Sequence, residues 1–354
     1  MITLDDLVAL AQAPDLDNRR LASLIEQFET ATPYGTRLEA KLDLIERLTG
    51  TRPEISSTGS CTTIVQNYVY LKGLGVKNIG RLVKRLPAVF GYNIAENMRP
   101  KVEYLKKLGV RNIGKFVERY PQVFRHSIAK NMQPKVDYLT RLGVKNIGKF
   151  VERSPAVFGY NIAGNMQLKV DYLTRLGVQN IGRLVERFPA VFSYDITGNM
   201  QPKVEYLQGL GVKNIGKLVE RFPAVFGYDI AKNMQPKVDY LISLGVKDIG
   251  RLVERFPQVF SYDVAENMQP KVDFYLKQGY GIQHIEQFPA AFGYSMDKRI
   301  KPRFAFLEQL GHNISGAPLS SILSPADKTF SKRFGGDERA YSNFLAEYVA
   351  RAAA

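Results

Sequence analysis

The sequence of 354 residues is poor in the residue types that build compact chemical sites, with one cysteine, three histidines and no tryptophan. The single cysteine, Cys61, excludes an internal disulfide and a thiolate metal cluster. His126, His284 and His312 each stand alone, without a second histidine or cysteine at ligand spacing. We therefore expect neither a metal nor another cofactor.

Long apolar runs and catalytic motifs are missing as well. No stretch of 18 apolar residues occurs, which excludes a membrane-spanning helix and a membrane partner. The N-terminal segment is acidic and resembles neither an organelle transit peptide nor a secretory signal. The chain either needs no import or carries its targeting segment outside this sequence. It has no paired carboxylates, no phosphate-binding loop and no nucleophile with a spaced base, so we do not expect an enzyme.

Positive charge, by contrast, is abundant. The chain has 49 Lys and Arg against 34 Asp and Glu, a net charge of +15. Residues 1–60 carry a net charge of −4, so the remainder carries +19. Such an excess of positive charge predicts an anionic partner. The excess lies entirely in the part of the chain after residue 60.

Six consecutive copies of a 34-residue unit fill the middle of the chain without an inserted or deleted residue. A Leu-Gly doublet marks each copy, from Leu74-Gly75 to Leu244-Gly245, and a proline keeps step with it, from Pro87 to Pro257. A fixed period of this length is typical of a solenoid, in which each unit buries its apolar side against its neighbours. A surface residue repeated in every unit then forms a stripe, which is where we look for function.

Each unit is predicted to contain two helices. The first lies between the N-cap Asn78 and Pro87, and its apolar residues recur at i, i+3, i+4 and i+7. The second is capped at Asn93, and the glycine of the doublet is its expected left-handed stop. Pro100 follows within two turns of that cap. Either it kinks one helix, or it lies in the first turn of a helix capped anew at Asn97.

The ends of the array differ from its middle, as is usual for terminal repeats. Residues 3–49 are predicted to form three short helices, and a half-repeat from Thr63 starts the stack. A degenerate seventh unit follows, after which Ser320–Phe334 appears irregular and Glu338–Arg351 helical. We therefore expect four segments: an N-terminal helical segment (1–50), a linker (51–61), the repeat array (62–310) and a C-terminal cap (311–354).

Three positions of the unit are basic in 17 of their 18 occurrences, the exception being Gln179. On a helical wheel the second and third lie opposite the apolar stripe, and the first projects the same way. Stacked in register, they predict a basic ribbon suited to a phosphate backbone. We name them column 77 (Lys77, Arg111, Lys145, Lys213 and Lys247), column 81 (Arg81, Lys115, Lys149, Arg183, Lys217 and Arg251) and column 85 (Arg85, Arg119, Arg153, Arg187, Arg221 and Arg255).

An ordinary solvated helix surface would also carry Lys and Arg, so a structural explanation competes with function. Column 81 lies in the first helical turn, where the macrodipole disfavours a cation by roughly 0.3–1 kcal/mol, and this favours a function. Column 85 lies near the helix end, where the dipole favours cations, and supports function less. Glu118 and its counterparts could pair with Lys115 or with a neighbouring unit.

A fourth basic column lies on the edge of the apolar stripe of the second helix. These side chains either pack and snorkel toward solvent or contact a ligand, and both alternatives stay open. The aromatic columns that begin at Phe90 and Tyr92 favour a core over base stacking. The fourth column, column 101, consists of Lys101, Lys135, Lys169, Lys203, Lys237, Lys271 and Arg303.

The unit pattern Leu-Gly-Val…Arg-Phe-Pro-x-Val-Phe…Asn-Met-Gln-Pro-Lys-Val-Asp-Tyr-Leu resembles the repeat of the mitochondrial transcription termination factor (mTERF) family, in its plant and algal style. Lys298–Arg303 followed by Ser320–Phe334 is similar to the C-terminal ending of that family. The resemblance covers residues 62–336 and leaves residues 1–60 outside.

The resemblance implies an all-α, right-handed helical-repeat solenoid, a half-doughnut superhelix of helix pairs with short 3-10 turns. It also implies a monomer that binds nucleic acid, mainly double-stranded DNA, along a basic concave groove. The implied role is transcription termination or wider control of gene expression in the chloroplast or mitochondrion. RNA or an acidic protein partner remain alternatives. Because the units are nearly identical, we expect recognition of charge and shape with weak sequence preference.

Overall fold

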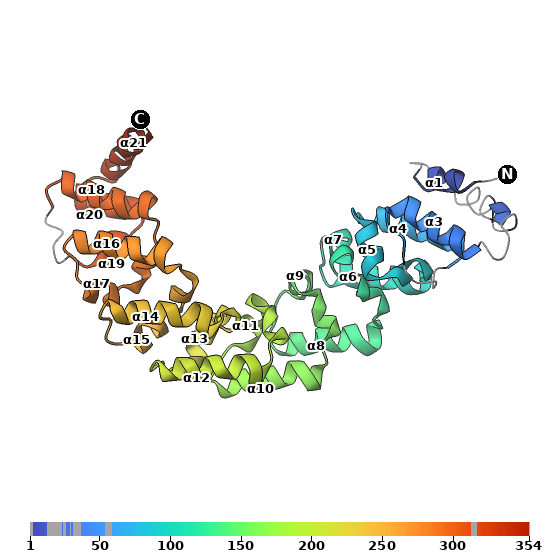
Figure 1. Cartoon of the computed structure of the whole chain (residues 1–354), viewed down its shortest axis with the longest axis horizontal. Coiled ribbons are helices and arrows are strands. Elements are labelled where there is room, and N and C mark those ends of the chain that lie inside the picture. Colours follow the sequence, from blue (N-terminus) through green and yellow to red (C-terminus); the bar gives the residue numbers. More distant parts are fainter. Residues whose placement is uncertain are drawn as a thin grey trace. The chain divides into compact units, whose positions relative to one another are not determined.

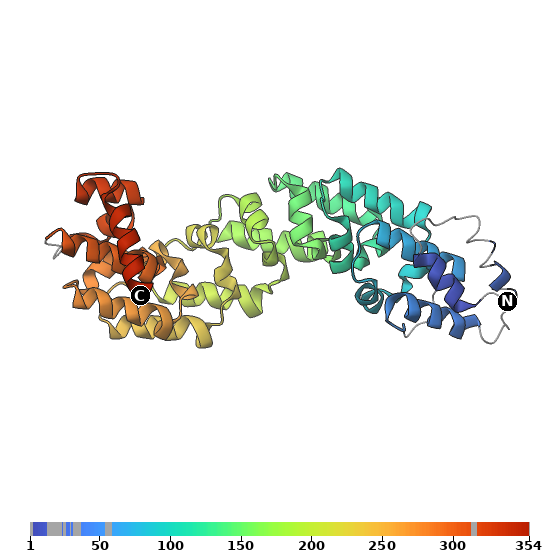
Figure 2. The ribbon, with the colours of Figure 1, turned by 90° about the horizontal axis from the view of Figure 1, so that it is seen from above.

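The computed structural model describes residues 3–12, 23, 26–28, 30, 37–53, 59–312 and 317–353. Every regular element within them is a helix, and no strand occurs there (Figures 1 and 2). The chain divides into two compact bodies. The N-terminal body comprises Met1–Val170 with Asn180–Phe192, and the C-terminal body comprises Asp171–Gln179 with Ser193–Ala354.

The α-helices of the N-terminal body alternate between first and second helices of the units once the array begins. In chain order they are α1 (Leu4–Gln12), α3 (Arg37–Thr49), α4 (Cys61–Gly73), α5 (Ile79–Arg85), α6 (Arg99–Lys107), α7 (Ile113–Arg119), α8 (Gln133–Arg141), α9 (Ile147–Arg153) and α11 (Ile181–Arg187), while α10 (Leu168–Arg175) crosses the boundary between the bodies.

The C-terminal body continues the alternation and ends in three further helices. Its α-helices are α12 (Gln201–Gly209), α13 (Ile215–Arg221), α14 (Gln235–Ser243), α15 (Ile249–Arg255), α16 (Gln269–Lys277), α17 (Ile282–Gln287), α18 (Lys301–Gln309), α19 (Leu319–Leu323), α20 (Asp327–Gly335) and α21 (Ala340–Ala353).

Each unit also contains a 3-10 turn and a π turn between its two α-helices. The 3-10 turns are η2 (Pro87–Gly91), η4 (Pro121–Arg125), η6 (Pro155–Gly159), η8 (Pro189–Ser193), η10 (Pro223–Gly227), η12 (Pro257–Ser261) and η14 (Pro289–Gly293). The π turns are η3 (Ile94–Met98), η5 (Ile128–Met132), η7 (Ile162–Gln167), η9 (Ile196–Met200), η11 (Ile230–Met234), η13 (Val264–Met268) and η15 (Met296–Ile300).

The first helix of each unit begins and ends as predicted. Asn78 is its N-cap and accepts a hydrogen bond from the Arg81 backbone N–H at 2.8 Å. Asp248 is the N-cap of α15 and accepts in the same way from the Arg251 backbone N–H at 2.8 Å. Leu86 leaves the α region, and Pro87 starts the 3-10 turn η2, because a proline disfavours helical backbone at the residue before it.

The second helix is one continuous helix, which decides the question about Pro100. Asn93 is the N-cap and accepts from the Glu96 N–H at 2.9 Å. Met98 N–H donates to the Asn93 carbonyl at 3.2 Å, a bond over five residues that makes the π turn η3. Pro100, which cannot donate a backbone bond, follows directly in the first turn of α6. The helix is not capped anew at Asn97, since no side-chain cap precedes α6.

The apolar stripes form the core, and the aromatic columns belong to it. Leu82, Val89, Phe90 and Met98 are completely buried in the first unit, and their counterparts are buried in the later units. The phenylalanine column is therefore core, as expected. The tyrosine column that begins at Tyr92 is only partly buried.

Two glycine columns set the geometry of the stack. The glycine of the Leu-Gly doublet has a positive φ, for example +89° at Gly109, and ends the second helix as predicted. The glycine after the first residue of each first helix has a different role. A Cβ on Gly148 would lie 2.4 Å from the Leu108 carbonyl oxygen. Only glycine therefore lets α9 approach the Leu108-Gly109 turn, one unit earlier, this closely.

The stack begins earlier than the sequence predicts. The half-repeat helix α4 starts at Cys61, where Ser60 caps it. Helix α3 packs against α4, and a Cβ on Gly80 would meet the Thr49 carbonyl oxygen at 2.4 Å. The end of α3 thus takes the place that a Leu-Gly turn takes in later units. The predicted helix between α1 and α3 falls largely outside the described residues, as do residues 54–58 of the predicted linker.

The predicted irregular stretch Ser320–Phe334 is wrong, because most of it forms α19 and α20. These helices are too short for their periodicity to show in the sequence. They are anchored by Arg303 on α18, whose fully buried guanidinium donates to the Ile322 carbonyl at 2.6 Å and to the Pro325 carbonyl at 2.8 Å. The predicted terminal helix is confirmed as α21.

Candidate nucleic-acid interface

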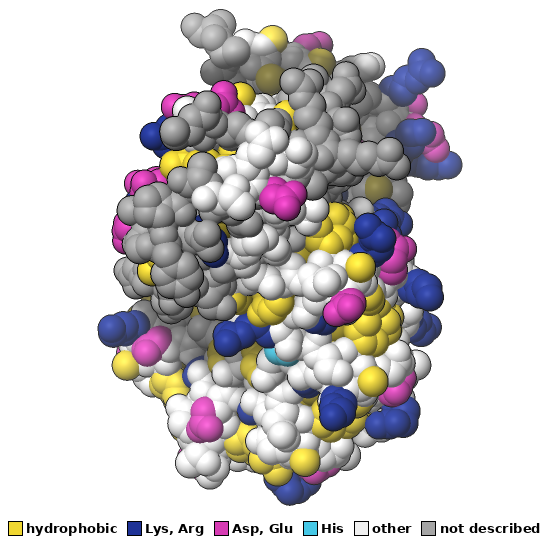
Figure 3. Space-filling model, turned by 90° about the vertical axis from the view of Figure 1, so that its right-hand side faces the viewer, with side chains coloured by type: hydrophobic (Ala, Val, Ile, Leu, Met, Phe, Trp, Pro, Cys, Tyr) yellow, Lys and Arg dark blue, Asp and Glu magenta, His cyan; other side chains and the backbone are white. Residues whose placement is uncertain are grey.

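All members of columns 77, 81 and 85 are exposed, as the helical wheel predicts. Within each body they lie at or on the first helices, which pack in series: α5 against α7, and α13 against α15. Figure 3 shows many Lys and Arg side chains projecting at the margin of one face, with Asp and Glu side chains among them. The columns can bind a polyanion only if neighbouring carboxylates do not already pair with their cations.

In the N-terminal body the three columns meet in the groove between α7 and α9. This groove has a volume of about 320 Å³. Its lining residues are Arg111, Asn112, Lys115, Phe116, Arg119, Glu152 and Arg153. One member of each column thus faces the same hollow, together with an arginine of the following unit.

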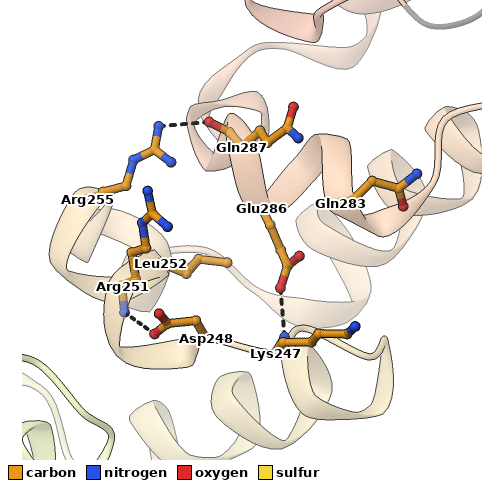
Figure 4. A pocket seen from close by; sticks show the side chains of 8 residues that line it. All are labelled: Lys247, Asp248, Arg251, Leu252, Arg255, Gln283, Glu286 and Gln287. Atoms are coloured by element: carbon orange, nitrogen blue, oxygen red, sulfur yellow. Dashed lines mark hydrogen bonds between the residues drawn. The ribbon is translucent and has the colours of Figure 1, made fainter.

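The C-terminal body has a groove of the same construction between α15 and α17 (Figure 4). Its volume is about 230 Å³. It is lined by Lys247, Asp248, Arg251, Leu252, Arg255, Gln283, Glu286 and Gln287. The three basic positions are the same as those of the α7–α9 groove, so the columns converge in each body.

The glutamates of the grooves bind main-chain amides instead of the basic side chains. Glu152 accepts from the backbone N–H groups of Arg111 at 2.5 Å and Asn112 at 3.1 Å. Glu286 accepts from the Lys247 N–H at 2.7 Å (Figure 4). Among the described residues no carboxylate forms an ion pair with a member of column 77 or 81. Of the two pairings expected for the Glu118 column, the one with the neighbouring unit is confirmed.

Column 85 has a structural task. The Arg119 guanidinium donates to the Glu152 carbonyl at 3.0 Å and to the Arg153 carbonyl at 3.3 Å. Arg255 donates in the same way to the Gln287 carbonyl at 2.8 Å (Figure 4). These bonds satisfy carbonyls at the end of the next first helix, which otherwise lack a partner. The arginines remain exposed and keep N–H groups for a ligand.

For column 101 the structure favours packing over ligand contact. Its lysines are 5–8 % exposed and Arg303 is fully buried. The Lys135 ammonium donates to the Phe158 carbonyl of the next unit at 2.9 Å, and Lys271 to the Phe292 carbonyl at 2.6 Å. Burial lowers the pKa of these two lysines. Lys203 and Lys237 instead donate to carbonyls of their own unit, those of Asn199 and Asn233. Because all its members are buried, we expect column 101 to serve packing, the first of the two alternatives that the sequence left open.

Arg303 is the clearest departure from the sequence-based site. Its guanidinium lies 4.4 Å from the centre of the Phe330 ring and donates to the Asp327 carboxylate at 2.5 Å. It has no exposed surface that a nucleic acid could contact.

Sequence reasoning missed the groove residues contributed by the seventh unit. Gln283 and Gln287 stand where Arg251 and Arg255 stand one unit earlier, counting back from the proline that ends each first helix. The shortened spacing before Pro289 hides this equivalence. Aligning the units on their prolines instead of their glycines would have shown it.

Two further features concern membranes and metals. None of its helices is both long and apolar enough to cross a bilayer. Within the same residues, no three His, Cys, Asp or Glu side chains gather to hold a metal ion.

A family model described as mTERF matches residues 102–246 and again residues 181–331. The two matches overlap, as expected for a periodic chain on which one model fits in more than one register. No curated protein matches the sequence. The matched regions together span more than half of the chain and contain the helix pairs and 3-10 turns of the later units, together with α19 and the start of α20. The chain belongs to the mTERF family, non-enzymatic nucleic-acid-binding helical-repeat proteins that act in organelle gene expression.

Proposed function

We propose that this protein binds double-stranded DNA through columns 77 and 81, with additional contacts from column 85, and acts in transcription termination or another step of organelle transcription. The observation that carries the proposal is that the exposed cations of columns 77 and 81, which form no ion pair among the described residues, recur in register and converge in grooves. A phosphate backbone is the regular polyanion that such a series fits.

The aromatic residues support a duplex over a single strand. Proteins that bind single strands without sequence preference stack bases on exposed aromatic rings. Here the phenylalanines from Phe90 to Phe292 are fully buried, and the tyrosines of the neighbouring column are partly buried. The described surface around the columns therefore presents cations, and it has no row of fully exposed aromatic rings on which bases could stack.

An electrophoretic shift series with duplex DNA, single-stranded DNA and RNA at two salt concentrations tests the ligand class. With roughly 6–10 phosphates contacted, duplex affinity should fall by about 10³–10⁵ between 50 and 200 mM salt. A flat salt response, or preference for RNA over duplex DNA, would contradict the proposal. Duplex DNA should also displace any acidic protein recovered with the chain.

Replacing all six residues of column 81 by glutamine tests the site. This variant should lose duplex binding and keep its helical circular dichroism, because these side chains are exposed. The matched control removes six exposed cations outside the columns: Lys107, Lys130, Arg141, Arg175, Lys232 and Lys277. Equal loss in both variants would point to net charge alone, and unchanged binding in the first would place the site elsewhere.

A further inference from the structure

We propose that the grooves between consecutive first helices within a body each seat one backbone phosphate of the duplex, and that this series stops before the groove between α15 and α17, which holds a phosphate weakly or not at all. The inference rests on the proposed duplex binding. It adds which group of the ligand each groove holds and where along the chain the contacts stop.

The α7–α9 groove has the composition of a phosphate seat. Its lining contains four cationic side chains, Arg111, Lys115, Arg119 and Arg153, against one carboxylate, that of Glu152. That carboxylate already accepts two main-chain N–H groups of the preceding unit. The cationic side chains therefore outnumber the acidic one by three, and arginine and lysine are the usual donors to phosphate oxygens.

The α15–α17 groove is formed by the corresponding basic positions, but it is smaller, about 230 Å³ against about 320 Å³, and carries much less positive charge. Its lining contains three cations, Lys247, Arg251 and Arg255, against two carboxylates, those of Asp248 and Glu286. The excess is one positive charge. The wall contributed by α17 has no cation, because Gln283 and Gln287 replace the arginines of the preceding unit, and it carries the Glu286 carboxylate.

This contrast predicts a weak or empty last seat. A phosphate entering the α7–α9 groove meets cations on both walls, whereas one entering the α15–α17 groove meets them on one wall only. Gln283 and Gln287 are both exposed, so arginine at these positions would restore the second basic wall without entering the core.

The test is a gain of function in the full chain. The variant Gln283→Arg/Gln287→Arg should add one phosphate contact, which steepens the slope of log K against log[salt] for duplex DNA by about 0.9. The control Gln201→Arg/Gln208→Arg adds the same charge at exposed positions of α12, outside the grooves, and should leave the slope unchanged. Lys115→Gln, in the α7–α9 groove, should lower the slope by about 0.9.

The outcomes separate the two proposals. If the parent binds duplex DNA but the Gln283/Gln287 variant keeps its slope, the phosphate seats are wrong and the proposed function stands. If both double variants steepen the slope equally, added charge acts without a seat, and the inference is again overturned. If the parent binds no duplex at any salt concentration, the proposed function fails and the seats fail with it.

Discussion

At the scale of single residues, neighbouring units pack closely at glycines, which have no side chain. In the six regular units, the glycine near the start of the first helix packs against backbone carbonyl groups at the end of an earlier helix. A Cβ on this glycine would clash with those carbonyl groups. A backbone carbonyl cannot rotate away as a side chain would. The Ile-Gly pair of the six regular units is thus required for this close packing, as the Leu-Gly doublet is required for the turn.

We predict that Gly148→Ala lowers the urea midpoint of unfolding and costs about 1–3 kcal/mol, because the new Cβ would lie 2.4 Å from the Leu108 carbonyl oxygen. The matched control is Gly209→Ala, at the end of α12, where a Cβ meets nothing within 4 Å. That change should be neutral or stabilise by up to about 1 kcal/mol. Equal midpoints for the two variants would contradict the steric account.

A second residue-scale feature is the histidine that interrupts the tyrosine column. His126 Nε2 lies 2.8 Å from the Tyr120 hydroxyl, and the two rings stack. Burial lowers the pKa of His126, and the nearby cations Lys135, Lys101 and Arg125 lower it further. The folded chain therefore holds this imidazole neutral at a pH where the unfolded chain has begun to protonate it.

This shift has a defined sign. Between the lowered folded pKa and the ordinary value of about 6.5, the unfolded chain binds more protons, so stability is lost as pH falls through that window. We predict that His126→Tyr, the residue found in most units, gains stability relative to the parent between pH 8 and pH 5. Urea midpoints at the two pH values measure it, and parallel pH profiles would contradict it.

At the scale of single elements, each first helix carries two kinds of basic residue with opposite roles. On α9, Lys149 is in the first turn, where its charge opposes the helix dipole. Arg153, at the other end, donates to the Glu186 and Arg187 carbonyls, each at 3.0 Å. The first suits a ligand and the second joins neighbouring helices.

We predict that Arg153→Gln lowers stability by about 0.5–1 kcal/mol, since it removes two exposed hydrogen bonds to main-chain carbonyls. Lys149→Gln should leave stability unchanged or raise it by up to about 1 kcal/mol, because an unfavourable dipole interaction is removed. The two variants lose the same charge on the same helix, so each controls for the other. Thermal melts measure the difference, and the reverse order of stability would contradict these roles.

At the scale of the whole molecule, the strict period makes a unit a removable module. Deleting residues 143–176 joins Leu142 to Gly177 and restores the Leu-Gly doublet. Because each unit of a solenoid contacts only its neighbours, the shortened chain should fold. The deletion removes Lys145, Lys149 and Arg153, one member each of columns 77, 81 and 85, together with the buried Lys169 of column 101.

We predict that this deletion reduces the slope of log K against log[salt] for duplex DNA by roughly 1–3, depending on how many of the three cations contact phosphate. Helical circular dichroism per residue should be unchanged. A shortened chain that folds but binds with the parent's salt dependence would show that the regular units are not the interface.

Much of the fold was predictable because the pattern is both local and repeated. The signals lie within one unit: the caps Asn78 and Asn93, the stop at Pro87 and the apolar stripes. Because they recur in six copies, they are unlike a chance pattern. The π turn before Pro100 was not predictable from the sequence. A cap at Asn93 followed by Asn97 and Pro100 fits one continuous helix as well as two separate helices. Helices α19 and α20 were missed because tertiary anchoring by Arg303, not periodicity, holds them in place.

The sequence by itself determined the helical stack, its period and the side of the first helix on which the cations of columns 81 and 85 stand, because these depend on spacing along the chain. Only the tertiary structure decided which cations remain available. Columns 77, 81, 85 and 101 look alike as residue types, yet column 101 is buried, with lysines such as Lys135 on a carbonyl of the next unit, and column 85 is partly engaged there. Those partners lie 20 to 35 residues away, and their positions follow from how units pack, which spacing within one unit does not reveal.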